Sequence, residues 1–347
     1  MTTLTGIPSV VPALPARPRR LHKPLMIVTV ALAVLTLVGI GGALIDDRQL
    51  LGHAIWMKPL KFLMSFTVYC ATLAWLLSLQ TKARRLGWWM GTVVAVGIAA
   101  EMVLIIGQVV VRGRQLHFNQ STPADELVHN IMALTIYVIW AAVLVIAIQL
   151  LFDKPGDRAL RWSIRLALGT TLGGMLLGNL MFRSTPAQEA AIAATGREDF
   201  FGGHTVGGED GGPGMPITGW STQGGDLRIG HFLGVHALQL IPLVALGLVL
   251  LARRFPVLRP EGPRTALVGI AAASYGGLIW LVTWQADRGE SLVHPGKSTL
   301  VAAGSLLAAT IVTSLAVLLR ARRTTLASAN TTSPGPSAPL GSARTGR

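Results

Sequence analysis

The stretch LMIVTVALAVLTLVGIGGALI, residues 25–45, contains no charged side chain. A hydrocarbon core about 30 Å thick is crossed by about 20 mostly apolar residues of α-helix, so this stretch predicts a transmembrane helix. Similar stretches recur along the chain and predict eight spans in all, at residues 25–45, 59–79, 87–111, 125–152, 159–182, 228–251, 265–286 and 298–319. We therefore expect an all-α fold, a polytopic transmembrane helical bundle of about eight spans.

The composition of the chain agrees with a membrane protein. Of its 347 residues, 51% are hydrophobic and 13% are charged, about half the charged fraction of a soluble domain. The formal net charge of +14 does not indicate nucleic acid as a partner, because apolar stretches separate the basic residues. The single cysteine, Cys70, excludes an internal disulfide, a zinc finger and c-type haem attachment through paired cysteines. The expected partner is the lipid bilayer.

Basic residues between the spans predict the orientation. Every second connection is basic, as are both ends of the chain. Because Lys and Arg accumulate on the cytoplasmic side, both termini are expected in the cytoplasm, which requires an even number of spans. The membrane domain is predicted at residues 25–320, between a disordered leader, 1–24, and a disordered tail, 321–347. A Gly-rich loop, 183–227, is expected on the outer side.

Two similar motifs predict helix starts on the outer side. In Thr122-Pro-Ala-Asp125 and Thr185-Pro-Ala-Gln188, a threonine precedes a proline at the first helical position and an acidic or amide side chain at the third. This arrangement satisfies free backbone N–H groups. The second motif predicts a short helix that ends near Gly196.

Polar residues at membrane depth are candidates for function. Glu101 lies in the third predicted span, and we consider it a candidate catalytic group or proton relay. The alternative is a hydrogen-bonded Glu that only joins helices. Of the eight histidines, only His22 lies on the predicted cytoplasmic side, so the outer side is where we expect chemistry.

Two stretches concentrate the candidate side chains: RGRQLHFNQSTPADELVHN, residues 112–130, and WSTQGGDLRIGHFLGVHALQ, residues 220–239. His and carboxylate side chains suit a metal ion, and neutral imidazoles also bind haem iron. The predicted metal ligands are Glu126, His129, His231 and His236. Cations suit a phosphate or carboxylate. The predicted anion-binding residues are Lys61, Arg112, Arg114, Asn119 and Arg228, and the predicted catalytic residues are Glu101, Asp226 and His236.

The stretch HAIWMKPLKF, residues 53–62, adds two lysines at the outer start of the second span. A lysine in this position commonly extends its ammonium toward lipid phosphates, which suits Lys58. Lys61 follows the helix-starting Pro59, and the sequence leaves open whether it does the same or faces inward.

Several functions fit these residues. We favour one metal ion or one haem b on the outer side, with redox-type chemistry; a two-haem transmembrane cytochrome is disfavoured because the inner half has no histidine. The alternatives are a membrane-embedded enzyme that binds an anionic lipid-linked substrate at the outer leaflet, a proton-coupled transporter that uses Glu101, and a structural packing subunit. The sequence alone leaves these alternatives open.

Two strings carry a resemblance to other proteins. HFN, residues 117–119, and GWSTQGGDLRIGHFLGVHALQ, residues 219–239, resemble strings of uncharacterised bacterial multi-pass membrane proteins. The resemblance covers most of the chain and implies a location in the bacterial inner membrane. It implies no activity and no catalytic residue.

Overall fold

The computed structural model describes residues 20–196 and 198–331. Most of the predicted leader and the part of the predicted tail beyond Thr331 lie outside the described residues. Within the described residues, eight helices are long and apolar enough to cross a membrane, which confirms the predicted number of spans.

The spans match the predicted ranges closely. They are α1 (Lys23–Ile45), α2 (Met57–Ser78), α3 (Arg84–Ile106), α4 (Pro123–Phe152), α5 (Arg158–Leu176), α7 (Arg228–Arg254), α8 (Glu261–Asp287) and α9 (Lys297–Thr331). A π-helical turn (Gly107–Val111) extends α3, and a 3-10 helix (Leu177–Phe182) extends α5. A further 3-10 helix, Pro256–Leu258, joins α7 to α8. Because α9 continues to Thr331, residues 321–331 are helical rather than part of a disordered tail.

The short elements lie in the connections. The short helix expected after Thr185 is α6 (Pro186–Thr195), and Gly196 ends it. The side chains of Thr185 and Gln188 form the predicted capping box, and Thr122 caps α4 through the backbone N–H of Asp125. Two antiparallel strand pairs complete the described elements: β1 (Gln49–Leu50) with β2 (His53–Ala54), and β3 (Thr205–Val206) with β4 (Gly225–Asp226).

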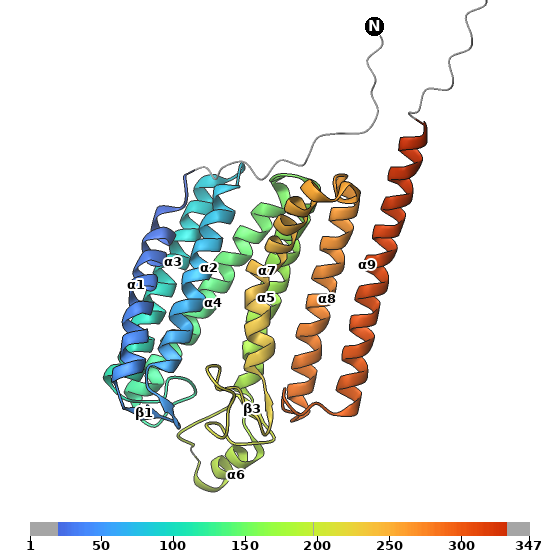
Figure 1. The fold of residues 1–347 in the computed structure, drawn as a ribbon. Helices are drawn as coiled ribbons and strands as arrows, with labels where there is room; N and C mark the ends of the chain where they lie inside the picture. Colours follow the sequence, from blue (N-terminus) through green and yellow to red (C-terminus); the bar gives the residue numbers. More distant parts are fainter. Residues whose placement is uncertain (1–19, 197, 332–347) are drawn as a thin grey trace, which may run out of the picture.

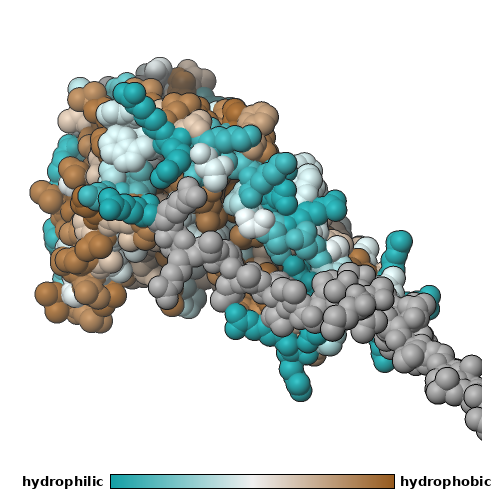
Figure 2. Space-filling model, turned by 90° about the horizontal axis from the view of Figure 1, so that it is seen from above, coloured by the Kyte–Doolittle hydropathy of each residue, from teal (hydrophilic) through white to brown (hydrophobic). Residues whose placement is uncertain are grey.

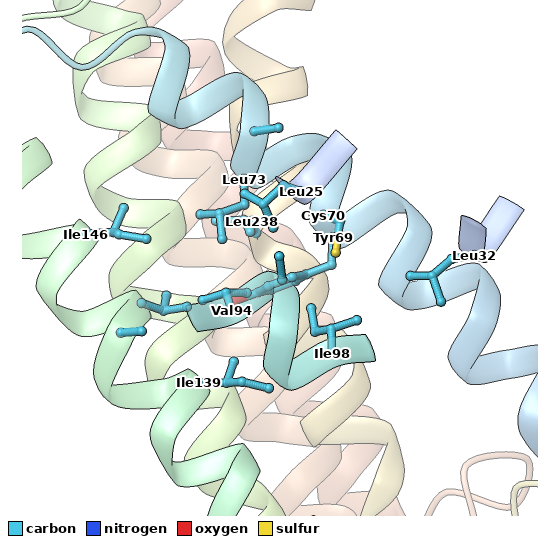
Figure 3. Close-up of a cluster of buried hydrophobic side chains, with 14 of the residues drawn as sticks. Leu25, Leu32, Tyr69, Cys70, Leu73, Val94, Ile98, Ile139, Ile146 and Leu238 are labelled. Carbon is cyan, nitrogen blue, oxygen red and sulfur yellow. The ribbon is translucent and has the colours of Figure 1, made fainter. Parts of the chain in front are cut away.

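The helices form two groups that meet side by side (Figure 1). The first group is α1 to α4, and the second is α5, α7, α8 and α9. The groups meet where α4 packs on α5 and where α2 touches α7. The larger hydrophobic core lies mainly in the first group and contains buried side chains such as Leu32, Leu73, Ile98 and Ile146, with Leu238 from α7 (Figure 3).

The two ends of the bundle differ. We call the end that carries α6 and both strand pairs the loop end, and the opposite end the basic end (Figure 1). The basic end holds the connections with Lys82, Arg84, Lys154 and Arg253. Seen from this end, Figure 2 shows hydrophilic side chains gathered over the helix ends and hydrophobic side chains around the rim. This arrangement suits helices whose flanks face lipid.

Two glycines make a close backbone contact between helices of the second group. A side-chain carbon at Gly174 of α5 would lie 2.3 Å from the Cα of Gly234 on α7. No side chain fits between these backbones, so the two glycines allow α5 and α7 to pack at short range. The contact also fixes α7, which carries many of the polar residues at the loop end.

We expect Gly174→Ala to destabilise the protein by about 1–3 kcal/mol, because the added methyl group forces α5 and α7 apart. Thermal unfolding in detergent measures the effect. Gly173→Ala is the matched control, since a side-chain carbon there meets nothing within 4 Å. Equal unfolding temperatures for the two variants would contradict the close contact.

Candidate functional site

Three cations and three histidines gather at the loop end between the two groups of helices. We call this set the loop-end cluster; it consists of His53, Lys58, Lys61, His117, His204 and Arg228. The residues come from the start of α2, the start of α7 and three connections. Because the two helix groups contribute together, the cluster exists only in the assembled bundle.

The peptide of Thr218 and Gly219 holds one side of the cluster. The Lys61 Nζ donates to the Thr218 carbonyl at 2.8 Å, and Arg228 Nη2 donates to the Gly219 carbonyl at 2.7 Å. Gly219 has a φ of +63°, and a side-chain carbon there would lie 3.4 Å from His53 Nε2. Lys61 therefore faces inward, which decides the question that the sequence left open.

A histidine and a carboxylate form a pair on the other side. His204 Nδ1 lies 2.9 Å from Asp210 Oδ2, and the same carboxylate accepts the backbone N–H groups of His204 and Thr205. An ionised carboxylate only accepts hydrogen bonds, so Nδ1 carries the proton. The Nε2 of the neutral ring is then free to act as a base.

Lys58 and His117 lie beside this pair. The His117 and His204 ring centres are 6.3 Å apart, and Lys58 is within electrostatic range of Lys61, Arg228 and Asp210. Neither Lys58 nor His117 makes a side-chain hydrogen bond or ion pair within the part of the chain that the structure describes. Lys58 is half-buried among these groups, and its extension toward lipid phosphates stays a prediction.

Burial and the neighbouring cations keep the three histidines neutral. The pKa of His117 is well below its ordinary value because the ring is buried and Lys58 is near. Burial also lowers the pKa of His204, and Lys58 and Arg228 add to this effect, while the hydrogen bond to Asp210 opposes it. The pKa of His53, which is an exposed residue, is lowered by partial desolvation, then by Lys61 and Arg228. The histidines are therefore available as proton acceptors near neutral pH.

Asp226 orients Arg228. Its side chain is fully buried, accepts the Ser221 backbone N–H at 2.8 Å and accepts the Arg228 Nε at 2.9 Å. The pairing of β3 with β4 holds Asp226 in place. Every described partner of this carboxylate is thus a donor of its own loop or of Arg228. The predicted catalytic role of Asp226 stays a prediction.

Three of the predicted anion-binding residues belong to a separate network. Arg112 and Arg114 pair with the fully buried Asp125, at 3.1 Å and 2.7 Å. The side chain of Asn119 donates to the Gln115 carbonyl and accepts from Ser121, within the same loop. Of the five residues predicted to bind an anion, the structure therefore brings Lys61 and Arg228 together, and it holds the other three around Asp125.

The predicted metal ligands have different partners. His129 Nδ1 accepts the Phe118 N–H at 3.3 Å, and His231 Nδ1 lies 2.9 Å from the Gly174 carbonyl. His236 lies between Ser65 of α2 and Gln239, and Glu126 is exposed. Among the described residues, no group of three or more His, Cys, Asp or Glu side chains is arranged to hold a metal ion. The metal or haem site stays a prediction without structural support.

Glu101 is almost fully buried in α3, with 1% of its surface exposed. Its Oε1 has no hydrogen-bond partner, and no hydrogen bond to His236 is present among the described residues. A buried carboxyl oxygen without a partner is energetically costly, so Glu101 is an unusual residue at this position. Its role as a proton relay stays a prediction.

Several residues of the cluster were not predicted as site residues. These are His53, Lys58, His117 and His204, together with Asp210 beside His204. The string HTVGGED, residues 204–210, contained a usable signal, since paired glycines allow a turn that returns Asp210 to His204. The concentration of histidines on one side of the membrane was the second signal.

The fold and site define a polytopic helical membrane protein with a cluster of cations and histidines at one end. Comparisons with family models, with curated proteins and with solved structures gave no match. The contacts within the chain therefore carry the functional argument.

Asp210→Asn is expected to lower the pKa of His204 further, because the variant loses the carboxylate that favours the protonated ring. Titration of ¹⁵N-labelled histidine by NMR in detergent micelles measures the shift. Glu209→Gln is the matched control, since this neighbouring carboxylate is exposed. An unchanged titration in Asp210→Asn would show that the pair does not form.

Proposed function

We propose that this chain is an integral membrane enzyme that binds a phosphate or carboxylate of its substrate in the loop-end cluster. One observation carries the proposal: among the described residues, neither Lys58 nor Lys61 forms an ion pair with a carboxylate, and the Nε2 of the neighbouring His204 has no hydrogen-bond partner. In the proposed orientation the loop end faces out of the cytoplasm of a bacterial cell and both termini lie inside. The positively charged connections at the basic end support that orientation.

Charge balance favours an anionic ligand. The two carboxylates nearest the three cations are Asp210 and Asp226, and each is already engaged, by His204 and by Arg228. Neither Lys58 nor Lys61 forms an ion pair with a carboxylate among the described residues, so their repulsion of each other and of Arg228 is only partly offset, by Asp210 near Lys58 and by Asp226 near Lys61. An anion between them would relieve this repulsion and accept charge-assisted hydrogen bonds.

The His204–Asp210 pair supports acid–base chemistry on the bound substrate. Where the bound group is a phosphate ester, a neutral His204 can take a proton at Nε2 from a hydroxyl group or a water molecule whose oxygen bonds to phosphorus while the bond from phosphorus to the leaving ester oxygen breaks. Asp210 holds the ring through Nδ1 and stabilises the imidazolium that forms. The proton then returns to the leaving group. This scheme requires only the cluster's own residues as proton donors and acceptors.

The other functions considered from the sequence have less support. A metal ion or haem b would need ligands that converge, and His129, His231 and His236 make separate contacts. A proton-coupled transporter rests on Glu101 alone. The loop-end cluster favours the anion-binding enzyme over both.

We expect the purified protein to bind radiolabelled sulfate, and Lys58→Gln to weaken binding at least tenfold. The reason is the loss of a charge-assisted hydrogen bond, worth about 1.5–3 kcal/mol. Scintillation proximity in a neutral detergent measures binding. Lys297→Gln is the matched control, because Lys297 is exposed at the start of α9, at the same end of the bundle. Absence of sulfate binding to the unmodified protein would refute the proposal.

The affinity for sulfate should rise as the pH falls from about 7 toward the depressed pKa values of the cluster histidines. A bound anion offsets the charges of Lys58 and Arg228, so it raises the pKa of His204 and couples binding to proton uptake. Sulfate keeps both of its charges over this range. Sulfate affinity should depend less steeply on pH in His204→Gln than in the unmodified protein. An identical slope in the two proteins would show that His204 takes up no proton when sulfate binds.

A further inference from the structure

The line along which α2 touches α7 begins at the loop-end cluster. Lys61 and Ser65 lie one turn apart on one face of α2, with Val68 on the same side. On α7, residues four apart follow Arg228 in the same way: Phe232, His236 and Leu240. We call the line formed by Ser65, Val68, Phe232, His236 and Leu240 the α2–α7 seam.

The two helices meet in the seam through a polar contact. Ser65 Oγ and His236 Nε2 are 3.4 Å apart, and both residues are half-buried. The apolar side chains of the seam remain open: Val68 is 48% exposed, Phe232 41% and Leu240 44%. The seam therefore presents apolar side chains to the hydrocarbon directly below charged ones.

An aromatic contact lies where the seam meets the cluster. The rings of Trp220 and Phe232 are 5.7 Å apart. Trp220 directly follows Gly219, whose carbonyl accepts the Arg228 hydrogen bond. Aromatic side chains favour the boundary between hydrocarbon and head groups, so this contact marks the depth at which a lipid changes from chain to head group.

We infer that the substrate of the loop-end cluster is a single-phosphate or carboxylate lipid whose apolar chain lies along the α2–α7 seam. The inference rests on the proposed anion binding and adds the substrate class. The order of side chains along the seam supports the inference. The cations of the cluster lie at one end of the seam, the Trp220–Phe232 pair follows, and the exposed apolar side chains come next. An anionic lipid has the same order, from its charged head group to its apolar chain. A water-soluble anion would contact the cations of the cluster and would leave the apolar side chains of the seam without a ligand.

Displacement of labelled sulfate by dodecyl phosphate and by methyl phosphate tests the inference. In the unmodified protein, dodecyl phosphate should displace sulfate at least about tenfold better, because its chain is buried along the seam. Val68→Trp and Leu240→Trp place large rings in the seam. Each should reduce the advantage of the dodecyl chain at least about threefold and leave displacement by methyl phosphate within about twofold.

Val96→Trp is the matched control, because Val96 is an exposed apolar residue of α3 outside the seam, with 64% of its surface exposed. Val96→Trp should keep the full advantage of dodecyl phosphate over methyl phosphate. Because dodecyl phosphate partitions into micelles equally in all samples, this control separates partition from binding along the seam. Equal displacement by the two phosphates in the unmodified protein overturns the inference. The inference is also overturned if dodecyl phosphate keeps its full advantage over methyl phosphate in both Val68→Trp and Leu240→Trp. In either case, the proposed function is still supported if the unmodified protein binds sulfate. Absence of sulfate binding would contradict both the proposed function and the lipid inference.

Discussion

No water reaches the hydrocarbon interior of a bilayer, and this constraint governs where the polar groups of the chain lie. Long helices satisfy the backbone internally, so solvated and ion-paired side chains gather at the two ends of the bundle. The basic end carries mainly cations, and the loop end mixes cations, carboxylates and imidazoles. Most candidate groups for chemistry that needs both charge and proton transfer therefore lie at the loop end, whereas Glu101 of α3 and His236 of α7 lie deeper along their helices.

The positions of three aspartates at the loop end determine which basic side chains form ion pairs. Asp125 binds the two arginines that follow α3, and Asp226 binds the arginine at the start of α7. Asp210 binds a histidine instead, so neither Lys58 nor Lys61 forms an ion pair with a carboxylate within the described part of the chain. A count of basic residues would place the anion site among the arginines. The proposed function instead has the anion bind at the lysines, because the three aspartates pair with the arginines and with His204.

The sequence predicts the spans well because hydrophobicity over about 20 residues is a local property of the chain. It predicts the site less well, because a site depends on contacts between distant segments. Lys61 and Arg228 were found from their places at helix starts. Arg112 is predicted from its place directly after the third span, but nothing local shows that a buried carboxylate thirteen positions later pairs with it. His204 and Asp210 lie in a Gly-rich loop, where no helical periodicity indicates which side chains meet.

The location of the cluster between the two helix groups links binding to assembly. His53 and Lys61 belong to the first group, and His204 and Arg228 to the second. Glycine packing holds α7 against α5, whereas α2 meets α7 in the seam through a 3.4 Å contact between Ser65 and His236. An anion that bridges Lys61 and Arg228 would bind only when the groups are together, so its binding free energy would stabilise their association. By the same linkage, any change that separates α2 from α7 weakens the binding of that anion.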